Sequence, residues 1–141
     1  MWNACSAFPI VSSRGVFLDA NPDRAKVLNE FIRTVRSGTL AVMPEGITLN
    51  YLTRTKTPLT FQTFTPPETA DWGIESVVIT ELEKRPPDRV AIVSRDVQEY
   101  GYYAFGLDYD RRLAMYLFAH YDVQRRWSMQ RFDAILLASR K

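Results

Sequence analysis

Residues 20–44, ANPDRAKVLNEFIRTVRSGTLAVMP, decide the fold because they join a helix directly to a buried strand. Asn21 can accept a backbone hydrogen bond as the N-cap of a helix, and Pro22 suits the first helical position. Apolar residues then repeat at helical spacing along one face, at Val27, Leu28, Phe31, Ile32 and Val35. The pattern predicts a helix over about residues 22–37. The short apolar run that follows and ends in proline predicts a buried strand over 39–43.

The same order of helix and strand recurs farther along the chain. An amphipathic pattern over residues 74–84 predicts a second helix, which ends before two successive prolines. Its predicted buried side chains are Ile74, Val77, Val78 and Leu82. The apolar run RVAIVS at 89–94 predicts a second buried strand. Because helices separate the two strands, we expect them to be parallel neighbours in one sheet, covered by both helices and joined by right-handed crossovers.

The remaining segments complete the predicted fold, which is α/β. We expect a short hairpin or an irregular entry strand around residues 13–15, a short helix within 45–56, and an extended segment anchored by Phe61 and Phe64. A third helix over 110–121 and a hairpin of strands 121–127 and 131–139 follow. In the third helix, the predicted inward side chains are Leu113, Met115, Leu117 and Phe118. The architecture is then a layered sandwich with a mixed, partly parallel sheet flanked by helices and a C-terminal antiparallel hairpin.

Length, charge and composition restrict the function classes. The 141 residues suit a single domain, 1–141, in which residues 1–10 are expected to form a poorly ordered lead-in from a preceding membrane region. The 18 basic and 16 acidic residues are interleaved, which disfavours nucleic-acid binding. One cysteine, Cys5, and one histidine, His120, form neither a disulfide nor a metal-ligand set, so we expect no metal and no cofactor. No run of 18 apolar residues exists to span a membrane.

Polar and aromatic side chains follow both predicted strands at the point where each strand ends. PEGITLNYLTR comes directly after residues 39–43, and RDVQEYGYYAFGLDY comes directly after 89–94. Ligands of open α/β sheets bind outside the carboxyl ends of the strands. We therefore expect one cleft at this edge, formed by Glu45, Asn50, Tyr51, Arg54, Arg95, Asp96, Glu99 and Tyr100.

Such a cleft suits a sugar. Carboxylates, amides and arginines hydrogen-bond hydroxyl groups in fixed directions, and aromatic faces pack on the apolar faces of a pyranose ring. A pair of carboxylates, Glu45 with Asp96 or Glu99, could also perform acid–base chemistry. The structural alternative is that Arg95 pairs locally with Asp96, that Glu99 caps a turn, and that the tyrosines cover the sheet edge.

The segment RDVQEYGYYAFGLDYD, residues 95–110, combines rings, charges and glycines in a way that suits neither a core strand nor a solvated loop. Gly101 and Gly106, like Gly46 after the first strand, allow sharp turns or close backbone approach. We predict that Phe105 and Tyr109 point inward and that Tyr102 or Tyr103 points outward. The docking or ligand surface is expected to include Tyr100, Tyr102, Tyr103 and Asp108.

Two long segments carry a resemblance to a known family. MPEGITLNYLTRTKTPLTFQTFTPPE and RPPDRVAIVSRDVQEYGYYAFGLDYDRRL resemble the C-terminal soluble domain of bacterial polytopic membrane glycosyltransferases, a family similar to the dolichyl-phosphate-mannose–protein mannosyltransferases. The shared motifs are Pro44-Glu45-Gly46, Asn50-Tyr51-Leu52-Thr53-Arg54, Pro66-Pro67-Glu68, Pro86-Pro87-Asp88, Arg95-Asp96, Tyr100-Gly101 and Phe105-Gly106-Leu107-Asp108-Tyr109. The likeness covers roughly residues 10–141. The family often has glycine where this chain has Asp110, which we expect to cap the third helix.

The resemblance implies a parent protein with many membrane helices and with this domain at its end, on the periplasmic face of the inner membrane. The sugar donor would be a lipid-linked phosphate sugar, and the catalytic carboxylate would lie on a loop between membrane helices rather than in this chain. The implied function is a non-catalytic accessory domain that binds acceptor glycan or docks on the membrane catalytic core. Its partners would be that membrane domain and a glycan or lipid-linked sugar. The alternative is a free-standing soluble α/β protein, such as a hydrolase, that binds a small polar ligand.

Overall fold

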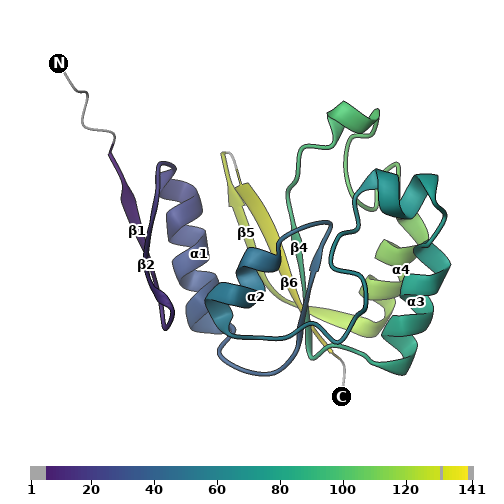
Figure 1. Ribbon diagram of the computed structural model, residues 1–141, viewed down its shortest axis with the longest axis horizontal. Coiled ribbons are helices and arrows are strands. Elements are labelled where there is room, and N and C mark those ends of the chain that lie inside the picture. Colours follow the sequence, from purple (N-terminus) through teal and green to yellow (C-terminus); the bar gives the residue numbers. More distant parts are fainter. Residues whose placement is uncertain (1–5, 131, 140–141) are drawn as a thin grey trace.

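The computed structural model describes residues 6–130 and 132–139 and has the predicted α/β class (Figure 1). The strands are β1 (Phe8–Ser12), β2 (Gly15–Asp19), β3 (Leu40–Met43), β4 (Arg89–Val93), β5 (Tyr121–Met129) and β6 (Phe132–Ser139). The helices are α1 (Pro22–Thr34), α2 (Ile47–Thr53), α3 (Glu75–Lys84) and α4 (Arg111–His120), with a π-helical turn at Pro67–Asp71 and a 3₁₀ turn at Gln98–Tyr100. None of the helices in the described ranges combines the length and the apolar character needed to cross a membrane.

Four strands form the main sheet in the order β3-β4-β6-β5. β3 and β4 are parallel, with Leu40 opposite Arg89 and Met43 opposite Ile92. β6 runs antiparallel to both β4 and β5. The mixed sheet, the parallel pair and the C-terminal hairpin therefore confirm the predicted architecture. β1 and β2 pair only with each other and form a separate two-stranded sheet.

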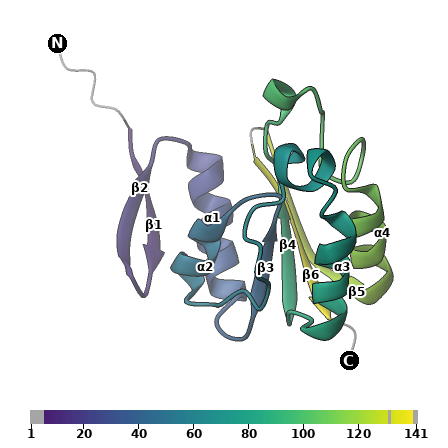
Figure 2. The same cartoon turned by 45° about the vertical axis from the view of Figure 1, so that its right-hand side comes forward.

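Helices cover both faces of the main sheet, as Figure 2 shows. On one face, Phe31 of α1 and Leu49 of α2 pack with Leu40 and Val42 of β3. On the other face, α3 and α4 supply Val78, Leu82, Leu113 and Leu117, which pack with Ala41, Met43 and Val90. All four residues of β3 are buried because successive side chains point to opposite, equally covered faces.

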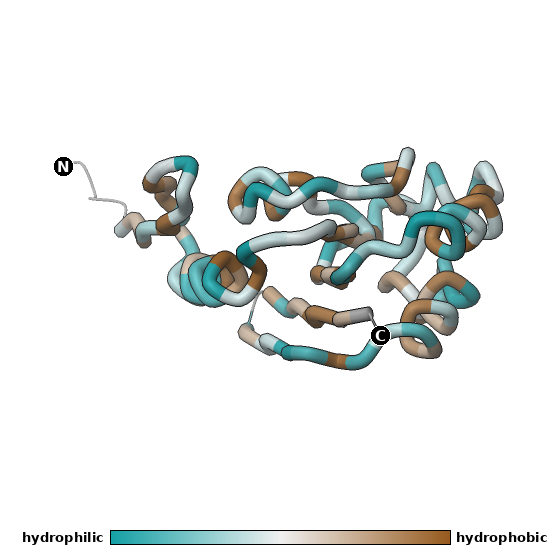
Figure 3. The backbone as a smooth tube through the Cα atoms, turned by 90° about the horizontal axis from the view of Figure 1, so that it is seen from below, coloured by the Kyte–Doolittle hydropathy of each residue, from teal (hydrophilic) through white to brown (hydrophobic). Residues whose placement is uncertain are grey.

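The C-terminal hairpin shows how the sheet ends. In Figure 3 the backbone of β6 is largely brown and that of β5 is largely teal, as expected for a central strand beside an edge strand. Along β5 only Tyr121 and Trp127 are buried. The Trp127 indole N–H donates to Glu30 Oε2 of α1 at 2.8 Å, which fixes the edge strand to the helix layer.

Two buried-face predictions were wrong. Val77 of α3 is 48% exposed, and Met115 and Phe118 of α4 are 72% and 42% exposed. The buried face of α3 is set by Val78 and Leu82, which lie four residues apart, so Val77 falls to the side of it. In α4 the buried residues are Leu113, Ala114 and Leu117, which turns Met115 and Phe118 outward. Of the predicted lead-in, residues 1–5 lie outside the described residues, and residues 8–10 belong to β1.

The start of α1 matches its predicted capping and also holds the N-terminal hairpin. The Asn21 side chain accepts from the amides of Asp23 and Arg24. The Asp19 carboxylate, at the end of β2, accepts from Arg24 at 2.6 and 2.8 Å and from the Asn21 amide at 2.8 Å. The side-chain hydrogen bond from Arg24 lowers the pKa of Asp19 below its ordinary value, against the opposing effect of burial. Asn29 adds two further bonds to the hairpin, to the Pro9 carbonyl and from the Val11 amide.

We predict that Asp19→Asn lowers the free energy of unfolding by about 1 kcal/mol at pH 7, because it removes a charge-assisted pair whose carboxylate is buried while its arginine is half exposed. The lowered pKa means that the stabilisation is present above the ordinary aspartate value of 3.8 and is lost as the pH falls through the lower folded-state pKa. Denaturant unfolding at pH 7 and at pH 2.5 measures both effects. Asp23→Asn, in the same helical turn, is the matched control and should cost less than half as much. Equal losses for the two variants would contradict the anchoring role of Asp19.

Candidate functional site

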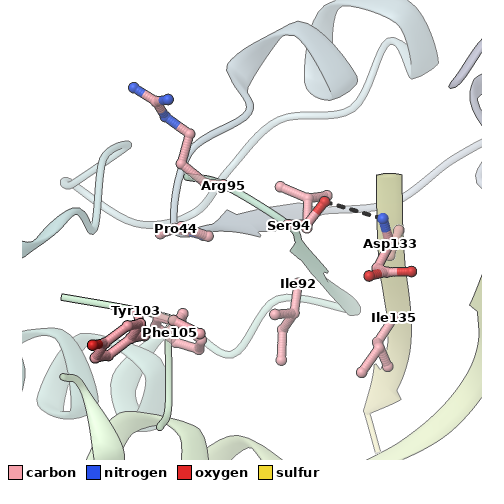
Figure 4. Close-up of a pocket in the computed structure, with 11 residues that line it drawn as sticks. Pro44, Ile92, Ser94, Arg95, Tyr103, Phe105, Asp133 and Ile135 are labelled. Atoms are coloured by element: carbon pink, nitrogen blue, oxygen red, sulfur yellow. Dashed lines mark hydrogen bonds between the residues drawn. The ribbon is translucent and has the colours of Figure 1, made fainter. Parts of the chain in front are cut away.

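A pocket of about 380 Å³ opens at the carboxyl end of β4, and we call it the edge pocket (Figure 4). Figure 4 shows Tyr103 and Phe105 on one side of it and Ile92, Asp133 and Ile135 on the other. Its full lining comes from the residue after β3, the end of β4, the aromatic segment and the start of β6: Pro44, Ile92, Val93, Ser94, Arg95, Tyr103, Ala104, Phe105, Asp133, Ala134 and Ile135.

The polar groups of the edge pocket come from two antiparallel strands that meet at their ends. The Ser94 amide donates to the Asp133 carbonyl at 2.8 Å, and Ser94 Oγ accepts from the Asp133 amide at 3.0 Å. These bonds engage the backbone of Asp133. In the described part of the chain, no hydrogen bond or ion pair joins the Asp133 carboxylate to another side chain. The carboxylate therefore remains able to accept hydrogen bonds from a ligand.

An ion-paired cluster stands beside the pocket. Arg95 donates through Nε to Glu45 Oε2 at 3.1 Å and through a terminal nitrogen to Glu99 Oε1 at 3.5 Å. The hydrogen bond to Glu45 raises the pKa of Arg95 above its ordinary value. A hydrogen bond to Glu99 raises the pKa of the nearby Tyr100 phenol. The structure thus brings the segments after β3 and β4 together, through groups that are about half exposed and bind each other weakly.

Two residues expected in the same cleft, Asn50 and Arg54, lie elsewhere, and Tyr51 lines a separate pocket together with Glu45 and Ser94. Asn50 donates to the Leu40 carbonyl at the opposite end of β3. Tyr51 packs edge-on against Phe17 of β2, and Arg54 donates to the Ser13 carbonyl of the hairpin. The cause is the direction of α2. The helix folds back from the end of β3 toward its beginning, and it carries the Asn50 and Arg54 side chains away from the sheet edge.

Asp96 and Gly46 have local structural roles. The Asp96 carboxylate accepts from the Gln98 amide at 3.0 Å and so shapes the turn after β4. The expected local pair of Arg95 with Asp96 is therefore replaced by pairs with Glu45 and Glu99. At Gly46 a Cβ atom would lie 2.6 Å from a methyl carbon of Val42, so the backbone there tolerates no side chain.

Residues 95–110, which we call the aromatic loop, are held by Asp108 and by the two glycines. The Asp108 carboxylate accepts from the amides of Tyr103 and Ala104 at 2.7 and 3.1 Å. Desolvation opposes ionisation of Asp108, but the two amide bonds prevail and hold its pKa below the ordinary value. Gly106 has a φ of 77°, and a Cβ atom there would meet the Ala114 methyl at 2.7 Å. Gly101 has a φ of 81°, which glycine adopts without strain.

The rings of the aromatic loop divide between the core and the surface. Tyr109 is 3% exposed and makes edge-to-face contacts with Tyr102 and Phe105, whose ring centroids lie 5.5 and 5.9 Å away. Phe105 and Tyr102 are half-buried, and Tyr103 is 74% exposed. The inward position of Tyr109 and the outward position of Tyr103 agree with the prediction. Tyr100, at 40% exposed, lies outside the lining of the edge pocket.

An apolar groove of about 690 Å³ adjoins the edge pocket, and sequence reasoning did not find it. The two share Ile92, Phe105 and Ile135. The groove adds Gly106 and Leu107 from the aromatic loop and Arg111, Ala114, Met115 and Phe118 from α4. Sequence reasoning also missed Asp133. The available signal was its place two residues before Ile135 at the start of a strand antiparallel to β4, which puts both side chains on one face beside the end of β4.

Asp110 differs most from its expected role. It stands at the N-cap of α4 with a left-handed backbone, φ 52°, but its side chain makes no capping bond. Glu75 of α3 takes that role, since its Oε1 accepts from the Leu113 amide at 2.8 Å. Asp110 is 5% exposed, and both carboxyl oxygens lack a hydrogen-bond partner in the described part of the chain. Burial raises the pKa of Asp110 to about 7, an interaction with Thr69 offsets part of the rise, and the charge of Glu75 adds to it.

Within residues 6–130 and 132–139, no three acidic, histidine or cysteine side chains are grouped so that they could hold a metal ion. Among the described residues, the side chains at the sheet edge offer hydrogen bonds, charge pairs and ring contacts.

We predict that Tyr103→Ala changes the free energy of unfolding by less than about 0.5 kcal/mol, because the ring is mostly in solvent. Phe105→Ala, in the same loop, should cost about 2 kcal/mol because its ring packs on Tyr109 and on the core. Denaturant titrations of both variants measure the difference. A comparable loss in Tyr103→Ala would show that its ring covers the core.

A second stability prediction concerns Tyr109, whose hydroxyl is buried without a hydrogen-bond partner in the described chain. Burial raises the pKa of this phenol far above its ordinary value. Tyr109→Phe removes the unsatisfied group and keeps the ring contacts, so we expect it to stabilise the protein by about 1 kcal/mol. Tyr121→Phe is the control, because the Tyr121 hydroxyl donates to the Pro87 carbonyl and its loss should destabilise the protein. Destabilisation by Tyr109→Phe would indicate a partner for that hydroxyl.

No family model, curated protein or solved structure matches this chain. The family resemblance therefore stays a prediction from the sequence motifs.

Proposed function

We propose that this chain is a non-catalytic accessory domain of a membrane-bound glycosyltransferase, on the periplasmic side, and that its edge pocket binds part of the acceptor glycan. The observation that carries the proposal is the composition of the pocket. It combines the exposed Tyr103 ring, the Asp133 carboxylate and an apolar floor of Ile92 and Ile135. A pyranose ring needs these two kinds of surface, an aromatic or apolar face for its C–H groups and acceptors for its hydroxyl groups.

The dimensions and polar groups of the edge pocket support this ligand class. A volume of about 380 Å³ falls at the lower end of the range for small-molecule sites. Ser94 and Arg95 add a hydroxyl and a guanidinium at the same rim, and Arg95 is braced by Glu45 and Glu99. A braced arginine loses less conformational freedom on binding than a free one.

The arrangement of carboxylates supports binding rather than sugar cleavage. Glycoside hydrolysis commonly uses two carboxyl groups on either side of the scissile bond. The described lining of the edge pocket contributes one carboxylate, Asp133. Glu45 and Glu99 stand outside that lining and share the Arg95 guanidinium. This is the observation that favours an accessory domain over the alternative of a free-standing hydrolase.

A second candidate function is docking on the membrane catalytic core of the same polypeptide. The observation that favours it is the exposed apolar surface next to the edge pocket, made of Tyr103, Leu107, Met115 and Phe118. Exposed apolar patches of this kind are typical of contact surfaces. In this proposal the lipid-linked sugar binds to the membrane core. The role of this domain is to fix its own position against that core. The genomic reading frame upstream of Met1 separates both proposals from a free-standing protein, because only they require preceding membrane helices.

Glycan binding can be tested by titrating the isotope-labelled chain with methyl glycosides, including methyl α-mannoside, and following backbone amide shifts. We expect shifts at Ser94, Tyr103 and Asp133. Asp133→Asn and Tyr103→Ala should each weaken binding by about tenfold, as expected when a charged hydrogen bond or a ring contact is lost. Tyr100→Ala, an exposed ring outside the pocket, is the matched control and should bind normally. Shifts confined to other surfaces, or no saturable shifts, would contradict the proposal.

The non-catalytic role gives a further expectation. The isolated chain should neither transfer sugar from a lipid-phosphate donor nor hydrolyse it, as measured with a radiolabelled donor. Sugar transfer by the purified chain that disappears in Glu45→Gln would overturn this role and assign catalysis to the ion-paired cluster.

A further inference from the structure

Asp110 joins the aromatic loop to α4 under three unfavourable conditions at once. Its backbone is left-handed, a conformation that costs roughly 1 kcal/mol for a residue with a side chain. Its carboxyl group is 95% removed from solvent, and neither oxygen has a hydrogen-bond partner in the described chain. The helix end that it occupies is capped by another residue, Glu75. Burying an ionised carboxylate without a partner is costly, whereas burying the neutral acid costs much less.

The groups around Asp110 compensate that charge only in part. The π-helical turn contributes Thr69, which favours the ionised form and lowers the pKa of Asp110, although its hydroxyl donates to the Thr65 carbonyl at 3.2 Å. From α3 comes Glu75, an acid whose charge opposes ionisation of Asp110. On the loop itself stand Asp108 and Tyr109, and on α4 stand Arg111 and Arg112, which are exposed. Neither arginine forms an ion pair with Asp110 in the described structure.

We propose that Asp110 is a proton-controlled latch: with a neutral carboxyl group it keeps the aromatic loop closed against α4, and loss of its proton drives the loop to open and carry Tyr103 and Phe105 away from the edge pocket. The latch regulates the site assigned above, and only its effect on ligand binding rests on the proposed function. The opening itself depends on Asp110 and the loop alone.

The contacts of Tyr109 transmit the change to the pocket wall. The Gly106 amide donates to the Tyr109 carbonyl at 2.8 Å, and the Tyr109 ring packs on Tyr102 and Phe105. Asp108, two residues before the latch, binds the amides of Tyr103 and Ala104. Residues 102–110 therefore move as one unit. If Asp110 turns its carboxylate to solvent, the carbonyl of Tyr109 and the bond from Gly106 move with it.

The direction of the pH effect follows from the two states of Asp110. In the closed loop its pKa is raised to about 7 by burial, and in an open loop it returns toward 3.8. Between these pH values the closed state binds more protons than the open state. The free energy of opening therefore falls as the pH rises from about 4 to about 7, and it levels off above that range.

Amide hydrogen exchange of Gly106, measured by NMR and corrected for intrinsic exchange, tests the latch. In the full chain we expect its protection to fall roughly fiftyfold between pH 5 and pH 7 and by about a further twofold to pH 8. Asp110→Asn keeps the shape of the side chain but has no carboxyl group to titrate. Asp110→Gly removes the carboxyl group and suits the left-handed backbone. Both variants should therefore show protection of the Gly106 amide that is independent of pH. Asp71→Asn, an exposed carboxylate in the neighbouring turn, is the control and should keep the wild-type slope.

A flat profile in the wild-type chain, or the same slope in Asp110→Asn and Asp110→Gly, would overturn the latch. Methyl glycoside titrations at pH 5 and pH 7 separate this result from the proposed function. We expect the wild type to bind the glycoside more tightly at pH 5 than at pH 7, and we expect Asp110→Gly to bind it equally at both pH values. If exchange of the Gly106 amide depends on pH but no glycoside binds at either pH, the result supports the latch and refutes the glycan site.

Discussion

The parallel pairing of β3 with β4, buried on both faces, is the constraint on which the rest of the structure depends. All four residues of β3 are buried, and Val90, Ala91 and Val93 of β4 are buried beside them. Because the two strands run in the same direction, their following segments leave the sheet at one edge. That geometry places Glu45 against Arg95, fifty positions apart in the sequence, and opens the edge pocket between the aromatic loop and β6. The position of the candidate site is thus a consequence of strand direction.

The aromatic loop is held rigid by internal contacts, although its outermost ring is exposed. In the proposed function its outermost ring must face solvent to contact a ligand, yet a mobile loop would lose entropy on binding. Backbone bonds to Asp108 and the packing of Tyr109 fix the loop from within, so that Tyr103 is presented without being buried. The unsatisfied polar groups of Tyr109 and Asp110 lie at the root of this loop, where strain is tolerated because the surrounding packing overdetermines the conformation.

Periodicity and capping predicted the helices and strands well, since they depend on neighbours in sequence. Asn21, Pro22 and the spacing of Val27, Phe31 and Val35 all act as expected. Of the residues expected at the sheet edge, Arg95 and Tyr103 line the edge pocket, and Glu45 stands beside it in a pair with Arg95. Asn50 and Arg54 were misplaced because the direction in which α2 leaves the strand is decided by tertiary packing. The cap of α4 comes from Glu75, which lies 38 residues before the Leu113 amide that it accepts from. No local sequence pattern near Asp110 predicts this cap.

The hairpin of β1 and β2 pairs with no strand of the main sheet and is held chiefly by α1, through Asp19, Arg24 and Asn29 (Figure 1). Its inner row, with Ile10 and Phe17, packs toward the helix layer, while Val11, Val16 and Leu18 on its outer row are 58–71% exposed. Elements with their own ladder often open as local cooperative units. We therefore expect the hairpin amides to exchange with solvent through a local opening that leaves the four-stranded sheet folded.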